Sequence, residues 1–458
     1  MWGFLTDVAS HVANFAANLC DPMTKHSPFG EPLNNEDKQI VEEVRQRIGQ
    51  KMHPNFNTDF NVYRFVMAAM RNHKKQRDIV KHAVEALNNH LRYRKALGLD
   101  VEYIPTFDEN PIFQKKLMPR GEILTKTDNQ NRLLWYIEYA SITVESIAHS
   151  LSSSEACKYQ FLQFEHMLRK VMEQEERTGC LSSLRHIVNM DGYEINPFTM
   201  LFVSSGTLAY YSQLFHFENY PELVTPVDMV NIATWIHVPY RLAKTMMPAG
   251  FSEKFRLHDK HFLKTLTADI KPEDIPVSLG GTDADIKFEN AEKVEPHRYW
   301  KVEKADLVEA LEGFHINTGK SRQVVINVTQ AQRELKWYFA TDADVYFGVF
   351  YEVLKNKILD FNKFFYFQGD SINNNFEEHP NLDNLEMVYP WLKITAKLVH
   401  EKDGIKLNRV GRYRIVFNNK HTWVARRYVQ FYGQIQDGDN SYKRLFTDGT
   451  MVGAEPLL

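Results

Sequence analysis

Two short segments carry residue types that could do phosphate or metal chemistry. Residues 313–321 read GFHINTGKS, close to a phosphate-binding loop, but five residues separate the glycines where four are needed, and no buried strand is expected before them. His258 and His261 flank Asp259 without further ligands at suitable spacing, so we expect a surface pair and no metal site. No Gly-x-Ser-x-Gly elbow or Cys–His arrangement is evident. The sequence therefore predicts a protein that is not an enzyme.

An apolar stretch near residue 240 has the composition of a wall for a hydrophobic ligand. Three of its side chains, Trp235, Leu242 and Met246, fall near one face of a helix. Methionine suits a surface that must fit varied ligands, because its side chain is flexible and polarisable. The same periodicity also fits a helix packed in a core. The apolar residues of the stretch are Trp235, Ile236, Val238, Leu242, Met246, Met247 and Phe251.

The N-terminal third is expected to be helical. Residues 1–19 have the pattern of an amphipathic helix, which either packs on the protein or lies at a membrane surface, although its polar face lacks basic residues. Prolines and a glycine in 22–34 indicate a linker. Beyond it, Asn35 is the expected cap of a helix. Together with apolar patterns over 62–70 and 76–97, this predicts a small helical bundle.

From about residue 106 the pattern changes to strands separated by helices. We expect a long helix over 153–175, which follows the first strand. Such alternation predicts an α/β sheet with helices packed on it. The expected strands are 133–139, 186–190, 227–233 and 255–258.

Beyond about residue 320 the expected elements are short strands without helices between them. Turn residues such as Gly411 and Asn418-Asn419 separate them. This pattern predicts an antiparallel, all-β sandwich. The expected strands are 323–328, 334–339, 346–351, 412–417 and 427–434.

Three motifs in the middle of the chain together resemble the CRAL-TRIO family, the Sec-fourteen-like lipid-transfer proteins. They are NYPEL at 219–223, YRLAK at 240–244 and IPVSLGG at 275–281. Each is weak alone, but their order over about 60 residues makes the match specific. The helical part before them looks like the N-terminal subdomain of the family. The resemblance implies an enclosed apolar cavity for a lipid and a mobile gate helix over the apolar stretch described above.

The C-terminal third is similar to a GOLD domain, a jelly-roll-like sandwich. The matching pieces are LKWYF at 335–339, FGVFY at 347–351 and GRYRIVFNN at 411–419. A GOLD domain paired with a CRAL-TRIO domain resembles the group of supernatant protein factor and tocopherol-associated protein. The resemblance implies a protein partner for the GOLD part.

The resemblance also implies which residues contact the ligand. Glu222 and Lys244 match a Glu and a Lys that hold the inositol headgroup in phosphoinositide-binding relatives, and Asn196 lies near the position of a Ser beside the cavity. The two positions that are basic in those relatives are Ala69 and Met70 here. A phosphate would lose its guanidinium partner, unless Arg71 replaces it through a shift of register. A neutral lipophile therefore becomes the favoured ligand over phosphatidylinositol.

Composition sets the remaining expectations. The 458 residues carry a net charge of −3, which gives no sign of a nucleic-acid partner. Three cysteines form no disulfide or metal pattern, so we expect a cytoplasmic protein with transient membrane association. Residues 393–427 hold ten Lys or Arg against two acidic residues, a net +8 that leaves −11 for the rest. This basic stretch either docks on anionic lipid or forms a solvated sheet face.

These observations predict a carrier that binds a lipid in a cavity and moves it between membranes, with no cofactor other than the bound lipid. The C-terminal domain would recruit a protein partner or a membrane. The alternative is an adaptor that senses lipid in signalling or trafficking without net transfer. The expected parts are an amphipathic segment and linker (1–34), a helical subdomain (35–105), a lipid-binding domain (106–282), a linker (283–300), a GOLD domain (301–440) and a tail (441–458).

Overall fold

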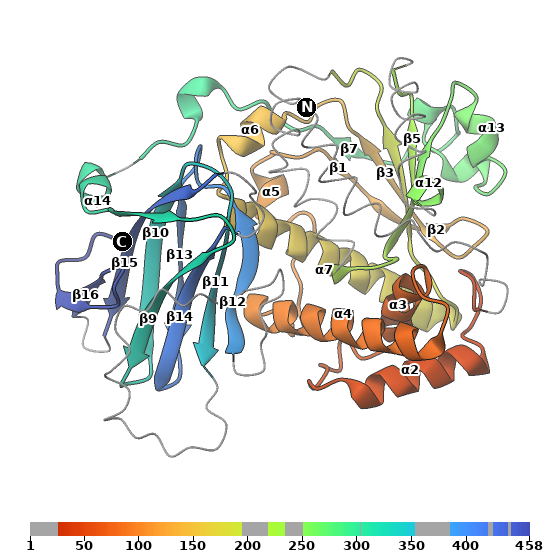
Figure 1. Ribbon diagram of the computed structural model, residues 1–458. Helices are drawn as coiled ribbons and strands as arrows, with labels where there is room; N and C mark the ends of the chain where they lie inside the picture. The colour runs from red at the N-terminus through yellow and green to blue at the C-terminus, as the bar shows by residue number, and fades with distance from the viewer. Residues whose placement is uncertain are drawn as a thin grey trace. The chain divides into compact units, whose positions relative to one another are not determined.

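The structure is a computed structural model that describes residues 26–194, 219–233, 251–302, 304–352, 385–419, 425–437 and 441–458. The contacts divide the chain into two compact units, shown in Figure 1. The first unit comprises the described residues within Met1–Leu91, Asp100–Ser146 and Tyr159–Val294. The second unit comprises those within Arg92–Leu99, Ile147–Lys158 and Glu295–Leu458.

Helices begin the described part of the chain, as the apolar periodicity predicts, and the predicted helix over 1–19 lies outside that part. They are α2 (Asn35–Arg47), α3 (Asp59–Met70) and α4 (Gln76–Leu97). The expected cap of α2 is wrong by one residue, because Asn34 has the extended backbone of a cap and its side chain accepts from the Asp37 N–H at 2.8 Å. Thr58 caps α3 in the same way, accepting from the Asn61 N–H.

A five-stranded sheet forms the centre of the first unit, in the order β2-β3-β4-β5-β6. β2 runs antiparallel to β3, and the other neighbours are parallel. β5 begins three residues earlier than predicted, because Pro226 lies inside the strand, where its pairing with β4 is irregular. The strands are Ile123–Thr127, Leu133–Glu138, Leu184–Asn189, Val224–Val230 and Phe255–Leu257.

Helices and short elements surround this sheet. The long helix α7 (Ser153–Thr178) follows β3 and extends three residues beyond its predicted end. The shorter helices are α5 (Pro111–Gln114), α6 (Val144–Ala148), α12 (Phe251–Lys254) and α13 (Phe262–Leu266). β1 (Arg120–Gly121) and β7 (Phe288–Glu289) form a separate antiparallel pair.

The two faces of the central sheet differ in how fully they are covered. One face, which we call the Tyr136 face, packs against α13 and the segment after it, and every member of its buried cluster is at most 3% exposed. That cluster consists of Leu134, Tyr136, Ile187, Val230, Leu266, Ile270, Ile275 and Leu279. Side chains alternate along a strand, so the opposite face, the Trp135 face, carries the residues between these.

The second unit contains two antiparallel sheets, and Figure 1 shows their strands stacked in layers. One follows the order β13-β10-β15-β16-β17 with β8 paired to β15, and the other the order β12-β11-β14-β9. The first sheet has strands Glu401–Leu407, Arg333–Thr341, Arg427–Gln436, Tyr442–Leu445, Met451–Gly453 and Glu312–Ile316. The second has Leu385–Ile394, Val345–Glu352, Gly411–Asn418 and Ser321–Val328. A short helix, α14 (Ala305–Glu309), precedes them.

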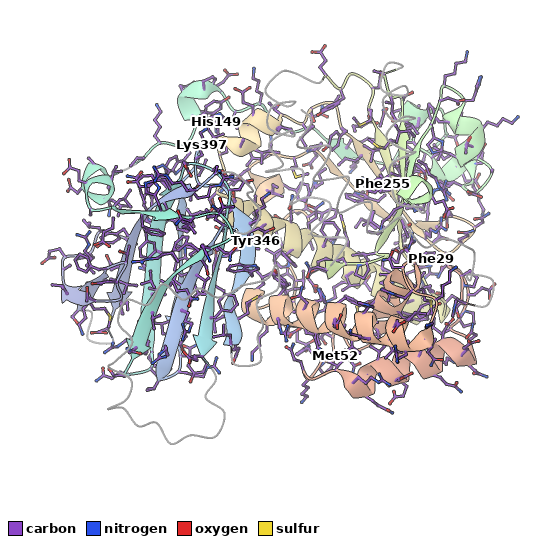
Figure 2. All side chains as sticks on the ribbon, viewed as in Figure 1. Phe29, Met52, His149, Phe255, Tyr346 and Lys397 are labelled. Carbon is purple, nitrogen blue, oxygen red and sulfur yellow. The ribbon has the colours of Figure 1, made fainter. Side chains whose placement is uncertain are left out.

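Aromatic side chains fill the space between these two sheets, and Figure 2 shows how densely side chains occupy both units. The rings of Phe339 and Phe347, from opposite sheets, lie 4.8 Å apart, and Phe417 lies 5.1 Å from Phe339. Trp337 is fully buried beside them. The prediction of a helical N-terminal part, an α/β domain and an all-β region with antiparallel sheets is confirmed. Among the described residues, no helix is long and apolar enough to cross a membrane.

Candidate functional site

The Trp135 face of the sheet presents two rows of side chains across β3, β4, β5 and β6. The register aligns Trp135, His186, Val227 and Phe255 in one row, and Ile137, Val188, Met229 and Leu257 in the next. Figure 2 labels Phe255 at the β6 end of the first row. Seven of the eight side chains are apolar, and only His186 is polar. The row pattern makes this face a nearly continuous hydrophobic surface.

Several residues on this face keep a partly exposed surface, although they lie within the sheet. His186, Val227, Met229 and Leu257 are only partly buried, whereas every member of the cluster on the Tyr136 face is buried. Residues 195–218 and 234–250 lie outside the described part of the chain. Covering an apolar surface of this kind lowers the free energy by about 25 cal/mol for each Å² that is removed from water.

Helix α7 belongs to the same side of the sheet. The ring of Phe107 lies 6.0 Å from Trp135 and 4.8 Å from His166 of α7, so it bridges the sheet and the helix. Phe161 and Phe164 of α7 both contact the ring of Tyr220, which precedes β5. Leu162 and Phe164 are partly exposed, like the sheet residues. The described part of this region therefore consists of apolar strand and helix surfaces.

A cluster of three charged side chains lies at the start of β5. Glu222, just before the strand, has a left-handed backbone with φ of 57° and a side chain that is 3% exposed. Its carboxylate accepts from Arg71 at 2.7 Å and lies 3.9 Å from the Lys254 ammonium. We call Arg71, Glu222 and Lys254 the ion cluster. The ion cluster combines two cations with one carboxylate.

Electrostatics favour the charged form of the Glu222 carboxyl. Burial by itself would raise the pKa of the Glu222 carboxyl, but the charges of Lys254 and Arg71 outweigh it, and the pKa lies below its usual value. Burial lowers the pKa of Lys254, and the negative charge of Glu222 opposes that change. Arg71 remains 26% exposed, so its guanidinium can also reach an anionic group such as a phosphate.

The structure describes only part of the predicted ligand site. Glu222 is buried in the ion cluster, and Phe251 begins α12, but nothing is described of its side chain. The remaining predicted residues lie outside the described part of the chain: Asn196, Trp235, Ile236, Lys244, Leu242, Met246 and Met247.

Sequence reasoning missed Lys254 and considered Arg71 only as a replacement through a shift of register. Arg71 follows Met70, the second position where a basic residue was expected, and it reaches Glu222 because it lies at the end of α3. Lys254 ends α12, directly before β6, and β6 pairs with β5. The pairing of β5 with β6 was the signal that could have identified Lys254. Residues that lead into neighbouring parallel strands meet at the same edge of a sheet.

The prediction that His258 forms a surface pair with His261 is wrong. The His258 side chain is 9% exposed and its Nε2 lies 2.7 Å from the fully buried Asp228 carboxylate. Asp228 also accepts from Arg185 at 2.8 Å. His258 comes directly after β6, which lies beside β5, so the strand pairing places it against Asp228. Among the described residues, no group of His, Cys, Asp or Glu could hold a metal ion.

The segment that resembles a phosphate loop lies in the second unit. Its first residues belong to β8, which pairs with β15, and its last residue begins β9. A turn at Asn317–Lys320 joins the two strands. A phosphate loop instead leads from a buried strand into a helix N-terminus. The arrangement therefore agrees with the expectation that this segment is not a phosphate site.

Comparison with known proteins identifies the middle of the chain. Residues 33–102 match a domain of unknown function, DUF8435, and residues 118–281 match the CRAL/TRIO domain. The CRAL-TRIO domain-containing protein F28H7.8 of Caenorhabditis elegans is 21% identical over 327 residues, which are 71% of this chain and 78% of that protein. The crystal structure of Sfh5 aligns with a TM-score of 0.36 and 12% identity, covering 57% of this chain and 94% of Sfh5. CRAL-TRIO proteins generally bind and transfer lipophilic molecules, and residues 118–281 of this chain match the model of the CRAL/TRIO domain.

Proposed function

We propose that this protein binds a lipid or another lipophile against the Trp135 face of its central sheet and carries it between membranes. The observation that supports this most is the contrast between the two faces of one sheet. The apolar cluster on the Tyr136 face is buried, whereas apolar residues on the Trp135 face stay partly exposed. Each methylene that moves from water to such a surface contributes about 0.8 kcal/mol, so a sixteen-carbon chain gains roughly 13 kcal/mol.

The predicted contacts outside the described residues belong to the same proposal. Segment 234–250 joins β5 to α12, and both of these elements border the Trp135 face. We propose that its apolar side chains complete the wall around the ligand and open to admit it. The residues concerned are Trp235, Ile236, Leu242, Met246 and Met247, together with Phe251 and the polar Asn196 and Lys244.

Native mass spectrometry of the purified full chain tests the binding proposal. We expect a retained hydrophobic molecule that organic extraction releases unchanged. A transfer assay from labelled donor vesicles to acceptor vesicles then separates the carrier from the lipid-sensing adaptor. Occupancy with transfer supports the carrier, whereas occupancy without transfer favours the adaptor. A chemically altered lipid would favour an enzyme, and a chain that takes up no lipid from vesicles would contradict binding altogether.

The ion cluster is the proposed site for an anionic headgroup. Lys254→Met should weaken binding of phosphatidic acid about tenfold, because a charge-assisted hydrogen bond to phosphate is lost, and should spare diacylglycerol with the same acyl chains. Vesicle-uptake measurements with both lipids check this result.

Two further lysine variants sharpen that test. Lys260→Met, an exposed site, serves as the control and should change neither affinity. Lys244→Met examines the lysine that the family resemblance suggested. Equal losses for both lipids in Lys254→Met would mean that Lys254 acts through folding. A selective loss of phosphatidic acid binding in Lys244→Met alone would mean that Lys244, and not the ion cluster, contacts the headgroup.

We also propose that the C-terminal β region is a GOLD domain that recruits a membrane or a protein partner. Within the basic stretch 393–427, Arg409 pairs with Glu386, and Arg412 and Arg414 pair with Glu352. Lys402 and Lys406 are exposed on β13 and remain able to meet an anionic surface. Flotation with vesicles that contain or lack phosphatidylserine distinguishes membrane recruitment from protein recruitment.

A further inference from the structure

His186 is the one polar side chain in the two rows of the Trp135 face. Its ring stacks on the indole of Trp135, with centroids 3.7 Å apart and planes inclined by 12°. Val227 lies beside it on β5, and Val188 follows it on the same face of β4. The imidazole therefore lies within an apolar surface, and part of the residue remains exposed there.

The ring lacks a partner for one of its nitrogens. Nε2 of His186 is buried and has no hydrogen-bond partner among the residues that the structure describes. Leaving such a group unsatisfied costs about 1–3 kcal/mol, and buried polar atoms in folded proteins almost always have a partner. Burial also lowers the pKa of His186 to about 3, so the ring is neutral near neutral pH and offers one donor and one acceptor.

We propose that His186 selects ligands by a hydrogen bond to an uncharged polar group, a hydroxyl or a carbonyl oxygen, on the lipophile. This inference rests on the proposed function, because it assumes that the ligand lies on the Trp135 face. A half-turn of the ring exchanges nitrogen and carbon positions, so either nitrogen can point to the partly exposed side. An alcohol or an ester carbonyl can then satisfy the imidazole without bringing a charge into the apolar surface.

A charged group does not suit this position. An ion placed among Trp135, Val227 and Val188 would lose its hydration without a counter-charge, which costs far more than a neutral hydrogen bond returns. The ion cluster, where β5 begins, already provides charged groups for an anionic headgroup. The ion cluster thus suits a charged group, and His186 suits an uncharged oxygen.

A matched pair of ligands tests this role directly. 1-Dodecanol and tridecane have the same number of heavy atoms and differ in one hydroxyl. Both are titrated against the full chain loaded with diphenylhexatriene, a fluorescent hydrocarbon. The measured quantity is the ratio of the two displacement constants, alcohol over alkane, in the wild type and in His186→Phe. Comparing the ratios cancels the different solubilities of the two ligands.

His186→Phe should reduce the preference for the alcohol about three- to tenfold, which is the effect of one buried neutral hydrogen bond, and should leave tridecane binding nearly unchanged. His261→Phe, the same substitution at an exposed histidine away from the Trp135 face, is the control and should keep the wild-type ratio. If thermal unfolding shows that the Phe variant does not fold, His186→Leu replaces it.

Two results would overturn the inference, and they have different meanings. An unchanged ratio in His186→Phe, with diphenylhexatriene still bound, refutes the role of His186 but leaves lipophile binding intact. A wild-type chain that binds neither diphenylhexatriene nor either competitor refutes the proposed function and the role of His186 with it.

Discussion

Replacing Arg64 by methionine should lower the free energy of unfolding of the first unit by about 3–5 kcal/mol, because it leaves the Glu175 carboxylate buried without its partner. The two side chains are each 3% exposed and meet at 2.5 Å. Arg64 also donates to the Ser182 carbonyl at 2.7 Å. Burial raises the pKa of Glu175, and the charge of Arg64 opposes that rise. Urea denaturation followed by far-ultraviolet circular dichroism measures the loss.

A double variant separates two causes of the lost stability, the unpaired charge and the lost packing. Arg64→Met combined with Glu175→Leu should recover more than half of the stability, because no isolated charge remains in the interior. Arg47→Met is the matched control, since Arg47 pairs with Glu43 at the same 2.5 Å distance but both side chains are solvent-accessible. We expect the control to cost about 0.5 kcal/mol or less. A loss of similar size in Arg47→Met and Arg64→Met would refute the role of burial.

The second unit should become less stable as the pH rises from about 4.5 to about 7, by up to about 3 kcal/mol, through Glu401 alone. Glu401 is 1% exposed on β13 and accepts from the Ser154 N–H at 3.1 Å and from the Ser154 hydroxyl. Burial raises its pKa from 4.5 to about 7; the Ser154 hydrogen bonds oppose this rise, and the nearby Asp403 adds to it. Tyr389 and Lys158 face the same site through hydrogen bonds to Asp403.

The sign follows from proton binding. The folded state holds the Glu401 proton more tightly than the unfolded chain, so its stabilisation is complete below the unfolded pKa and disappears as the pH passes the folded value. Glu401→Gln keeps the shape of the side chain and removes its titrating carboxyl group. Calorimetry of wild type and Glu401→Gln at about pH 5 and about pH 8 should show a stability difference that changes by roughly 3 kcal/mol.

A surface glutamate provides the control for this pH effect. Glu334→Gln, at a 40% exposed position, should leave the pH dependence of the wild type intact. Other titrating groups, such as the histidines, contribute equally to all three proteins and cancel in the differences. Parallel pH profiles for the wild type and Glu401→Gln would mean that Glu401 titrates normally and is not held in its protonated form.

Periodicity was sufficient to locate the longest helices, α2, α3, α4 and α7, but it missed the strands β12 and β13. The boundaries of α4 agree with the prediction at both ends, because its apolar residues recur on one helical face. Strand ends were less predictable, as at β5, which begins three residues before its predicted start and contains Pro226. The predicted cap of α2 was one residue too late. Asn34 and Asn35 follow each other, and only the backbone conformation decides which of them is the cap.

The sequence alone determined the classes of structure and the CRAL-TRIO resemblance, because both depend on local spacing along the chain. Only the tertiary structure decided which charges and rings meet. Glu222 contacts Arg71 across 151 positions of sequence, and Arg64 contacts Glu175 across 111. His186 stacks on Trp135 because two strands pair in one register. Such contacts depend on strand order and register, which no local pattern encodes.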